Sequence, residues 1–177
     1  TNLVLSWNKA KGVQGYDVFF VNCSKKKPKL TASVKGNNKV KRTFRKLKKN
    51  TPYKAYVKAW IRKNGKKTYV RTSPVVHAYT TGGTKHYTNV RSVTVKKKKI
   101  ILKAGRSCII KANLNKLYKG RKIMPKIHTA ALRYVSTSPG VAKVTKRGRI
   151  KGLKKGKCCV YVIAHNGVSK KTDVIIK

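Results

Sequence analysis

Apolar and polar residues alternate along most of the chain, and the i, i+3, i+4 spacing of a helix is hard to find. Side chains of a β-strand point alternately to its two faces, so this period of two predicts strands with one apolar face. The first two strands are expected to carry Leu3, Leu5 and Trp7 on one face and then Tyr16, Val18 and Phe20. The alternation predicts an all-β protein.

The segment Tyr53–Trp60 alternates in the same way, with lysine on its polar side. The residues expected to point inward are Tyr53, Ala55, Val57 and Ala59, and those expected to point outward are Lys54, Tyr56, Lys58 and Trp60. Outward Tyr56, Trp60, Tyr69 and Tyr79 have two interpretations. They stack on bases or sugar rings, or they pack against neighbouring strands on an exposed sheet face.

Turn signals join these strands into antiparallel hairpins. Asn64-Gly65 and Asn166-Gly167 each lie between two alternating runs, and this dipeptide tolerates the positive φ angles of a two-residue hairpin turn. Short strands with turns at this spacing predict antiparallel β-sandwiches. Asn115–Ala130 is the least regular part of the second half and is expected to be a long loop.

The alternation lapses once, in the polar and glycine-bearing segment Thr80–Asn89. This lapse predicts two tandem immunoglobulin-like sandwiches, with a first domain over residues 1–81, a linker over 82–89 and a second domain over 90–177. No run of 18 apolar residues is present, so no membrane insertion is expected. The start at Thr1, without an initiator methionine or a signal peptide, suggests a processed piece of a longer protein.

Charge is the most unusual property of the chain. It has 47 lysines and arginines but only two acidic residues, Asp17 and Asp173, which gives a formal net charge of +45. Like charges within the Debye length of about 8 Å repel one another, so a bound anionic polymer should weaken this repulsion. Most of the cations are lysines, and hydrated point charges favour diffuse attraction over specific recognition.

Clusters of basic residues are the candidate anion-binding sites. One alternative is a solvated coat, but solubility needs a net charge of only about 2 to 8 on a small domain. The candidates are Arg62, Lys63, Lys66 and Lys67, then Lys96, Lys97, Lys98 and Lys99, and finally Lys146, Arg147 and Arg149.

Catalytic and metal sites are not expected. Paired carboxylates need two neighbouring acids, and the only two here fall in different predicted domains. A Ser-His-Asp site would need one of the same two acids, and no nucleophile-elbow pattern is present. The cysteines and histidines lack the spacing of metal ligands, so no cofactor is expected and the histidines are expected to be ordinary surface or loop residues.

The second half contains a candidate disulfide between Cys108 and Cys158. Cys108 alternates with Ile110 and Ala112, and Cys158 with Val160 and Val162, so both thiols should enter one core from opposite sheets. The alternative is a pair of buried free cysteines that behave as small hydrophobic residues. Adjacent Cys158 and Cys159 should point to opposite faces of their strand.

The first half resembles a fibronectin type III domain over nearly its whole length. The resemblance rests on Trp7 at the end of a strand, on "GYDVFF" after a short turn, and on "LKKNTPYKAYVKAW" from Leu47 to Trp60. In that family the tyrosine of the last segment bonds back to the backbone, a role that Tyr53 fits. The resemblance also implies a first strand before Leu3, which is expected to be missing here.

The second half, from about Val90 to Lys177, resembles a bacterial immunoglobulin-like group 2 domain. It contains "RSVTV", then "LKAGRSCIIKANL", and then "YVSTSPGVAKVTKRGRIKGLKKGKCCVYVIAHNGV". This order is similar to the family's serine-rich turn, Val-Ala-x-Val strand, glycine hairpin and final strands. Tyr134 stands where the family usually has tryptophan.

These resemblances imply a non-catalytic adhesion or spacer module of an extracellular or cell-surface bacterial protein. Its expected partners are an anionic cell-wall polymer such as teichoic acid, an acidic glycan, or other domains of the same protein. One alternative is a nucleic-acid-binding protein, although lysines throughout both domains and the lack of a groove-entering helix favour only nonspecific binding. Another is a purely structural spacer for a flanking enzyme.

Overall fold

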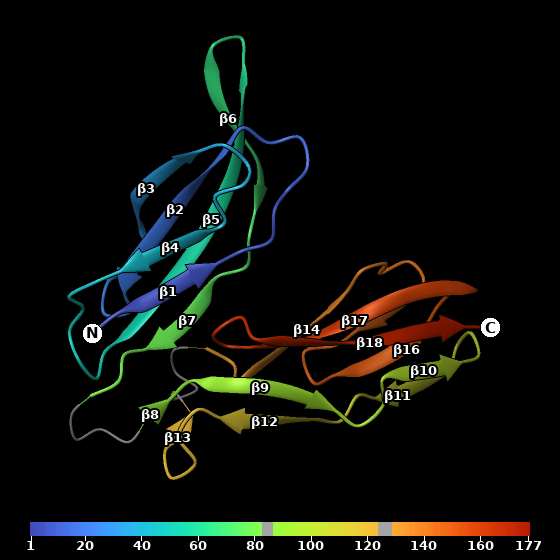
Figure 1. The fold of residues 1–177 in the computed structure, drawn as a ribbon. Helices are drawn as coiled ribbons and strands as arrows, with labels where there is room; N and C mark the ends of the chain where they lie inside the picture. Colours follow the sequence, from blue (N-terminus) through green and yellow to red (C-terminus); the bar gives the residue numbers. More distant parts are fainter. Residues whose placement is uncertain (83–86, 124–128) are drawn as a thin grey trace. The chain divides into compact units, whose positions relative to one another are not determined.

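A computed structural model describes residues 1–82, 87–123 and 129–177 of the chain. Strands are the only regular secondary structure in these ranges, so the protein is all-β as the alternation predicts (Figure 1). No helix in these ranges could cross a membrane. The chain divides into two compact units, Thr1–Tyr87 and Thr88–Lys177, which are called unit 1 and unit 2 below.

Unit 1 is a sandwich of two antiparallel sheets. One sheet pairs β1 with β4, and the other has the order β3–β2–β5–β6, with β7 also paired to β5. The strands are β1 (Leu3–Ser6), β2 (Gly15–Asn22), β3 (Lys29–Lys35), β4 (Lys41–Phe44), β5 (Pro52–Lys63), β6 (Lys66–Thr72) and β7 (Val76–Tyr79).

The core of unit 1 lies between these two sheets. Its buried residues are Val13, Tyr16, Val18, Val57 and Ala59, against which Leu5, Trp7 and Phe44 pack from the other side. Aromatic stacking extends the core, because the Phe20 ring lies 3.8 Å from that of Phe44 and 5.1 Å from that of Tyr53. The inward positions predicted for β5 and those of Tyr16 and Val18 on β2 are buried as predicted, whereas Phe20 is partly buried.

Tyr53 forms the predicted corner. Its hydroxyl accepts a hydrogen bond of 3.2 Å from the backbone N–H of Lys48. The Asn64-Gly65 turn is also confirmed, since both residues have positive φ and Lys63 pairs directly with Lys66. Together these contacts fix the two ends of β5.

The prediction that Trp60 points outward into solvent is wrong. Trp60 is 4 % exposed although it lies on the outer side of β5. It pairs with Gly15 of β2, and a Cβ at that glycine would collide with the indole ring. The ring therefore lies against bare backbone, and the Lys67 ammonium lies over its other face at 4.8 Å.

Unit 2 contains the remaining strands of the chain. They are β8 (Tyr87–Thr88), which begins at the boundary, β9 (Val90–Val95), β10 (Lys99–Leu102), β11 (Ser107–Ile109), β12 (Ala112–Lys116), β13 (Lys122–Ile123), β14 (Leu132–Ser136), β15 (Ala142–Val144), β16 (Arg149–Gly152), β17 (Gly156–Ala164) and β18 (Ser169–Ile176).

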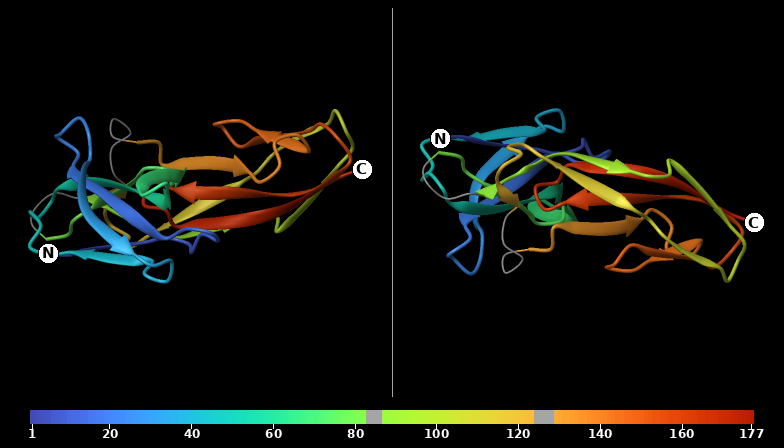
Figure 2. Two further views of the ribbon diagram at one scale, coloured as in Figure 1. Left: turned by 90° about the horizontal axis from the view of Figure 1, so that it is seen from above. Right: turned by 90° about the horizontal axis from the view of Figure 1, so that it is seen from below.

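Unit 2 is also a sandwich. One layer has the order β10–β18–β17–β14, and the opposite layer contains β9–β12 and β11–β16–β15. The long pair β17–β18 runs side by side in each view of Figure 1 and Figure 2. The β10 strand pairs with β18 in parallel, whereas the pairs β11–β16, β12–β9, β14–β17, β15–β16 and β17–β18 are antiparallel.

The core of unit 2 is larger and mostly aliphatic. Among the described residues, those fully or nearly fully buried include Val93 and Ile150 from one layer and Val160, Val162 and Val174 from the other. Residues 165–167 form a three-residue turn between β17 and β18, because Ala164 N–H bonds to Val168 C=O at 2.8 Å. Only Gly167 of the predicted Asn166-Gly167 pair has positive φ, so this turn is one residue longer than predicted.

Parts of two predicted loops fall outside the described residues. Of the linker over 82–89, residues 83–86 lie outside, while Thr88 is buried and belongs to unit 2. Of the loop predicted over Asn115–Ala130, residues 124–128 lie outside. The described part of that loop includes the end of β12 and the short strand β13.

Candidate interaction surface

The first predicted basic cluster lies at the tip of the β5–β6 hairpin of unit 1. Arg62 and Lys63 end β5, and Lys66 and Lys67 begin β6 on the other side of the turn. All four are exposed. The Arg62 guanidinium donates a hydrogen bond of 2.9 Å to the C=O of Gly65 and thereby braces the tip.

Lys67 differs from the other members of this cluster because it forms an ion pair with a buried acid. Its ammonium lies 3.0 Å from both carboxylate oxygens of Asp17 and 3.0 Å from the hydroxyl oxygen of Ser33. The Asp17 carboxylate also accepts hydrogen bonds of 2.6 Å from Ser33 and 2.7 Å from Tyr69. We call Asp17, Ser33, Lys67 and Tyr69 the Asp17 network.

The Asp17 network keeps its carboxylate ionised although Asp17 is fully buried. Burial alone would raise the pKa of Asp17, but hydrogen bonds from Ser33, Tyr69 and Lys67 and the ammonium charge outweigh it, so the pKa is lowered. The hydrogen bond that Tyr69 donates to Asp17 raises the pKa of Tyr69 to about 12. Sequence reasoning missed this network, since alternation assigned Asp17 to the solvent face.

The aromatic residues considered for base or sugar stacking pack within unit 1. Tyr56 stacks on Phe19 of the neighbouring strand with ring centroids 4.6 Å apart, and the Lys58 ammonium lies over Phe19 and Tyr69. The expectation that Tyr79 points outward is wrong. It is buried, its ring contacts that of Tyr87, and its hydroxyl donates a hydrogen bond of 2.7 Å to Asn50.

Another predicted cluster lies on the β15–β16 hairpin of unit 2. Lys146 and Arg147 occupy the turn, and Arg149 begins β16. All three are exposed. Lys143 and Lys151 lie directly opposite each other on the same hairpin, so cations face each other without an acid between them. Like charges directly opposite each other repel, and anionic counterions would weaken this repulsion.

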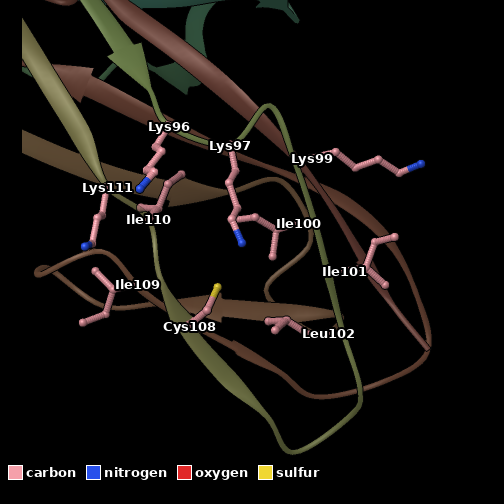
Figure 3. Close-up of a pocket in the computed structure, with 10 residues that line it drawn as sticks. All are labelled: Lys96, Lys97, Lys99, Ile100, Ile101, Leu102, Cys108, Ile109, Ile110 and Lys111. Carbon is pink, nitrogen blue, oxygen red and sulfur yellow. The ribbon is translucent and has the colours of Figure 1, made fainter.

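The lysines at 96–99 follow β9 and lead into β10, where they meet an apolar groove (Figure 3). The groove has a volume of about 370 Å³, and Lys96, Lys97 and Lys99 line it together with Lys111. Its apolar lining consists of Ile100, Ile101, Leu102, Cys108, Ile109 and Ile110. We call it the β10–β11 groove. Lys98 is exposed but does not line it.

Cys108, Cys158 and Cys159 lie where alternation predicts, and all four thiols, including that of Cys23, are free in the structure. Cys108 and Cys158 pack into the core of unit 2 from its two layers, without a bond between them. Burial raises the pKa of the Cys108 thiol, which the nearby Lys97 ammonium partly offsets. The disulfide stays a prediction, tested by whether alkylation changes the mass of the unreduced protein.

Cys159 and the histidines show no metal-binding arrangement in the part of the chain that the structure describes. The Cys159 thiol lies on the outer face of β17 and donates a hydrogen bond of 3.2 Å to Asp173, its partner on β18. His165 is buried, but it lies in a turn, in agreement with the expectation that the histidines are surface or loop residues. It begins the turn after β17, where its N–H bonds to Ala131 C=O. His86 and His128 lie outside the described residues.

No protein-family model matches the chain, and no curated protein matches it either. Among solved structures it is similar to the S-layer protein rSbsC, with 14% identity and a TM-score of 0.43 over 96% of this chain and 21% of that one. The FN1–FN3 domains of chicken CNTN1 give 16% identity and a TM-score of 0.38, over 99% of this chain and 60% of that one.

A C-terminal fragment of intimin, solved with the intimin-binding domain of its translocated receptor, gives 15% identity and a TM-score of 0.32. That similarity covers 98% of this chain and 56% of the fragment. The chain therefore spans less than two thirds of each of these proteins. The sheet orders described above make both units immunoglobulin-like β-sandwiches, the architecture shared by fibronectin type III and bacterial immunoglobulin-like domains.

Proposed function

We propose that the chain is a non-catalytic adhesion or spacer module of a bacterial surface or secreted protein, which its lysines hold to an anionic polymer. In this proposal a fibronectin type III-like domain precedes a bacterial immunoglobulin-like group 2 domain. The polymer is a wall polymer such as teichoic acid, or an acidic glycan.

The observation that carries the proposal is that both side-chain carboxylates of the chain already have lysine partners. Asp17 pairs with Lys67 at 3.0 Å, and Asp173 pairs with Lys171 at 3.4 Å. The chain has only these two acids, so no further acidic side chain is available to neutralise its other cations. Counterions from outside must therefore do so.

The positions of the acids also support a non-catalytic role. Asp17 belongs to unit 1 and is saturated with hydrogen bonds, whereas Asp173 belongs to unit 2. A pair of acids about 5 to 9 Å apart, which glycoside hydrolysis requires, is not available within either unit. The basic clusters lie on exposed strand ends and turns in both units, which suits diffuse attraction.

The test is a salt-titrated binding panel with teichoic acid, mucin glycan, heparin and duplex DNA, and with a neutral glycan as the control. Affinity for each polyanion should fall steeply as salt rises, with a slope of about −0.9 per phosphate neutralised on DNA. The neutral glycan should not bind. Equal affinity for the neutral glycan, or affinity that does not change with salt, would contradict the proposal.

Two charge variants show whether the attraction is diffuse. One replaces Arg62, Lys63 and Lys66 in unit 1 with glutamine, and its matched partner replaces Lys146, Arg147 and Arg149 in unit 2. Each removes three charges from exposed positions. Similar losses are expected from both. A loss confined to one variant would mean that a local site, rather than the whole surface, binds the polymer.

Nonspecific nucleic-acid binding is the second candidate, since the same cations attract phosphate. The described residues include no helix that could enter a groove. DNA binding should therefore show no preference among sequences. A sequence preference that survives at about 0.3 M salt, where the Debye length is about 6 Å, would favour this candidate over the first.

A further inference from the structure

The β10–β11 groove lies between two strands that are both sheet edges. Among the described strands, β10 pairs only with β18 and β11 only with β16. A turn over residues 103–106 joins the two strands. Because each strand has a single partner among the described strands, its other side has no neighbour in the sheet. An exposed edge of this kind is a template for an added strand.

Backbone groups along both strands are directed to these free sides. The C=O groups of Lys98 and Leu102 accept hydrogen bonds from Asp173 N–H of β18 and from Lys177 N–H directly after it. Because successive residues of a strand direct their backbone groups to opposite sides, Lys99 and Ile101 direct theirs away from β18. Ile110 N–H bonds to Gly148 across the other sheet, so Ile109 directs its backbone groups away from β16 by the same rule.

The lining of the groove is apolar where these free edges lie. Ile101 is 51% exposed and Ile109 is 54% exposed, so both present apolar surface to solvent beside the free edges. Ile100 and Ile110 lie beneath them as part of the core. A volume of about 370 Å³ accommodates a few side chains of an extended segment.

Four lysines are among the residues that line the groove, Lys96, Lys97, Lys99 and Lys111, although the Lys99 ammonium points away from the others in Figure 3. Figure 3 shows the Lys97 side chain extending between Ile110 and Ile100 toward Cys108. Arg149 adds a fifth cation as the cross-strand partner of Ile109. The nearest acid is Asp173, opposite Lys99, and it is already paired with Lys171.

From these observations we infer that the β10–β11 groove binds an extended acidic segment of another protein, which adds as a strand to the free edge of β10. Backbone hydrogen bonds to Lys99 and Ile101 orient the bound segment along β10. The apolar side chains of the segment contact Ile101 and Ile109, and its carboxylates pair with the lysines of the groove. This is strand addition with charge complementarity. It does not depend on the polymer binding proposed above.

The occupant is neither this chain nor a second copy of it. These 177 residues contain two acids, one buried in unit 1 and the other paired on β18, so they supply no acidic strand. Two copies, each with a charge of +45, also repel each other. A phosphate-rich polymer would neutralise the lysines, but it would neither bury the isoleucines nor pair with the edge of β10.

The probe is a short labelled peptide of alternating glutamate and valine, titrated against the full chain by fluorescence anisotropy. Two control peptides separate the contribution of the apolar side chains from that of backbone pairing. Polyglutamate of equal charge lacks the apolar side chains, and the same peptide with alternate backbone nitrogens methylated cannot complete a strand. The alternating peptide should bind about tenfold more tightly than either control at about 0.3 M salt.

Variants of the protein locate the binding. Ile101→Thr with Ile109→Thr keeps β-branched side chains on both strands and should weaken the peptide about tenfold. Val135→Thr on β14, the other edge of the same sheet, is the matched control and should change nothing. Lys97→Gln should weaken binding more than Lys155→Gln, which removes the same charge outside the groove.

Amide hydrogen exchange provides the structural readout. The N–H groups of Lys99 and Ile101 should become protected when the alternating peptide is added, and thermal unfolding followed by far-UV circular dichroism shows that the variants remain folded. Equal binding of polyglutamate, with no effect of the threonine variants and no protection along β10, would overturn the inference. That result would leave charge attraction by the whole surface intact.

Discussion

The two units reach stability in different ways, although both are lysine-rich sandwiches. Unit 2 has an aliphatic core with twelve buried hydrophobic residues among those described, whereas the corresponding cluster of unit 1 has five. Unit 1 adds stacked aromatic rings and the Asp17 network. Its single acid is fully buried, while the acid of unit 2 is exposed and its side chain is 55% accessible.

This difference shows two ways in which a fold can tolerate a large excess of cations. Unit 2 leaves its cations in water and relies on apolar burial, which does not depend on charge. Unit 1 brings one cation to a buried acid and satisfies that acid with two hydroxyl groups. The stability of unit 1 should therefore depend on the ionisation of one carboxylate, and that of unit 2 should not.

The largest effect is expected from Ile150→Ala, which tests the aliphatic core of unit 2. Ile150 is fully buried on the central strand of β11–β16–β15, so truncation should cost about 3 to 4 kcal/mol through lost burial and a cavity. Both tryptophans, Trp7 and Trp60, belong to unit 1. Amide exchange in β16–β18 should accelerate while the urea midpoint from tryptophan fluorescence stays constant.

Ile109→Ala is the matched control for that prediction, because Ile109 lies on the strand paired with β16, next to Cys108, the direct partner of Ile150, but is mostly exposed. Ile109→Ala should lower the free energy of unfolding of unit 2 by no more than about 0.5 kcal/mol. A large shift of the tryptophan midpoint by Ile150→Ala would show that the two units do not unfold independently. The comparison between them would then fail.

Asp17→Asn should destabilise unit 1 by about 2 to 3 kcal/mol. The variant removes a buried charge partner of Lys67 and weakens two charge-assisted hydrogen bonds. The cost stays below that of a fully buried pair because the Lys67 side chain is 32% accessible and can be solvated. The measurement is urea unfolding followed by tryptophan fluorescence.

Asp173→Asn is the matched control for the Asp17 variant. It removes the same charge from an exposed position in unit 2 and should leave the tryptophan midpoint unchanged. Equal shifts from both variants would show that the overall charge, rather than the Asp17 network, sets the stability of unit 1.

Acidification should destabilise unit 1 through the same carboxylate. The folded pKa of Asp17 is lowered, so its stabilisation is fully present above the unfolded pKa of about 4 and is lost as the pH falls through the folded pKa. The tryptophan midpoint, measured from about pH 6 to pH 2, should fall in the natural protein and stay flatter in Asp17→Asn.

The smallest effect is expected from Tyr53→Phe at the corner of unit 1. It removes the hydroxyl that accepts the N–H of Lys48 and keeps the ring stacked on Phe20. The expected cost is about 1 kcal/mol, measured as a shift of the tryptophan midpoint. A cost as large as that of Asp17→Asn would make the corner, rather than the buried ion pair, the main polar contribution to unit 1.

Alternation predicted the strands and most core positions because burial on one face of a strand follows from local sequence. It could not predict that Trp60 is buried on the outer face, since that depends on Gly15 in the paired strand. The Asp17 network was missed for the same reason. Its four side chains come from β2, β3 and β6, and only the strand order brings them together.

The candidate surface was predicted only in part. Composition identified the lysines at 96–99, but nothing local linked them to Lys111 or to the exposed Ile101 and Ile109. Whether a strand is a sheet edge is decided by its neighbours, so a groove between two edges has no signature in a single segment. The exposed isoleucines alternate with buried ones and therefore look like ordinary strand residues.

The parallel pairing of β10 with β18 has a mechanical consequence. A pull on the two ends of unit 2 draws the start of β10 and the end of β18 in opposite directions along their common axis. The hydrogen bonds that Asp173 N–H donates to Lys98 C=O and Lys177 N–H donates to Leu102 C=O lie across that axis, so they should carry the load together instead of opening one after another. We therefore expect unit 2 to resist tension applied at its two ends.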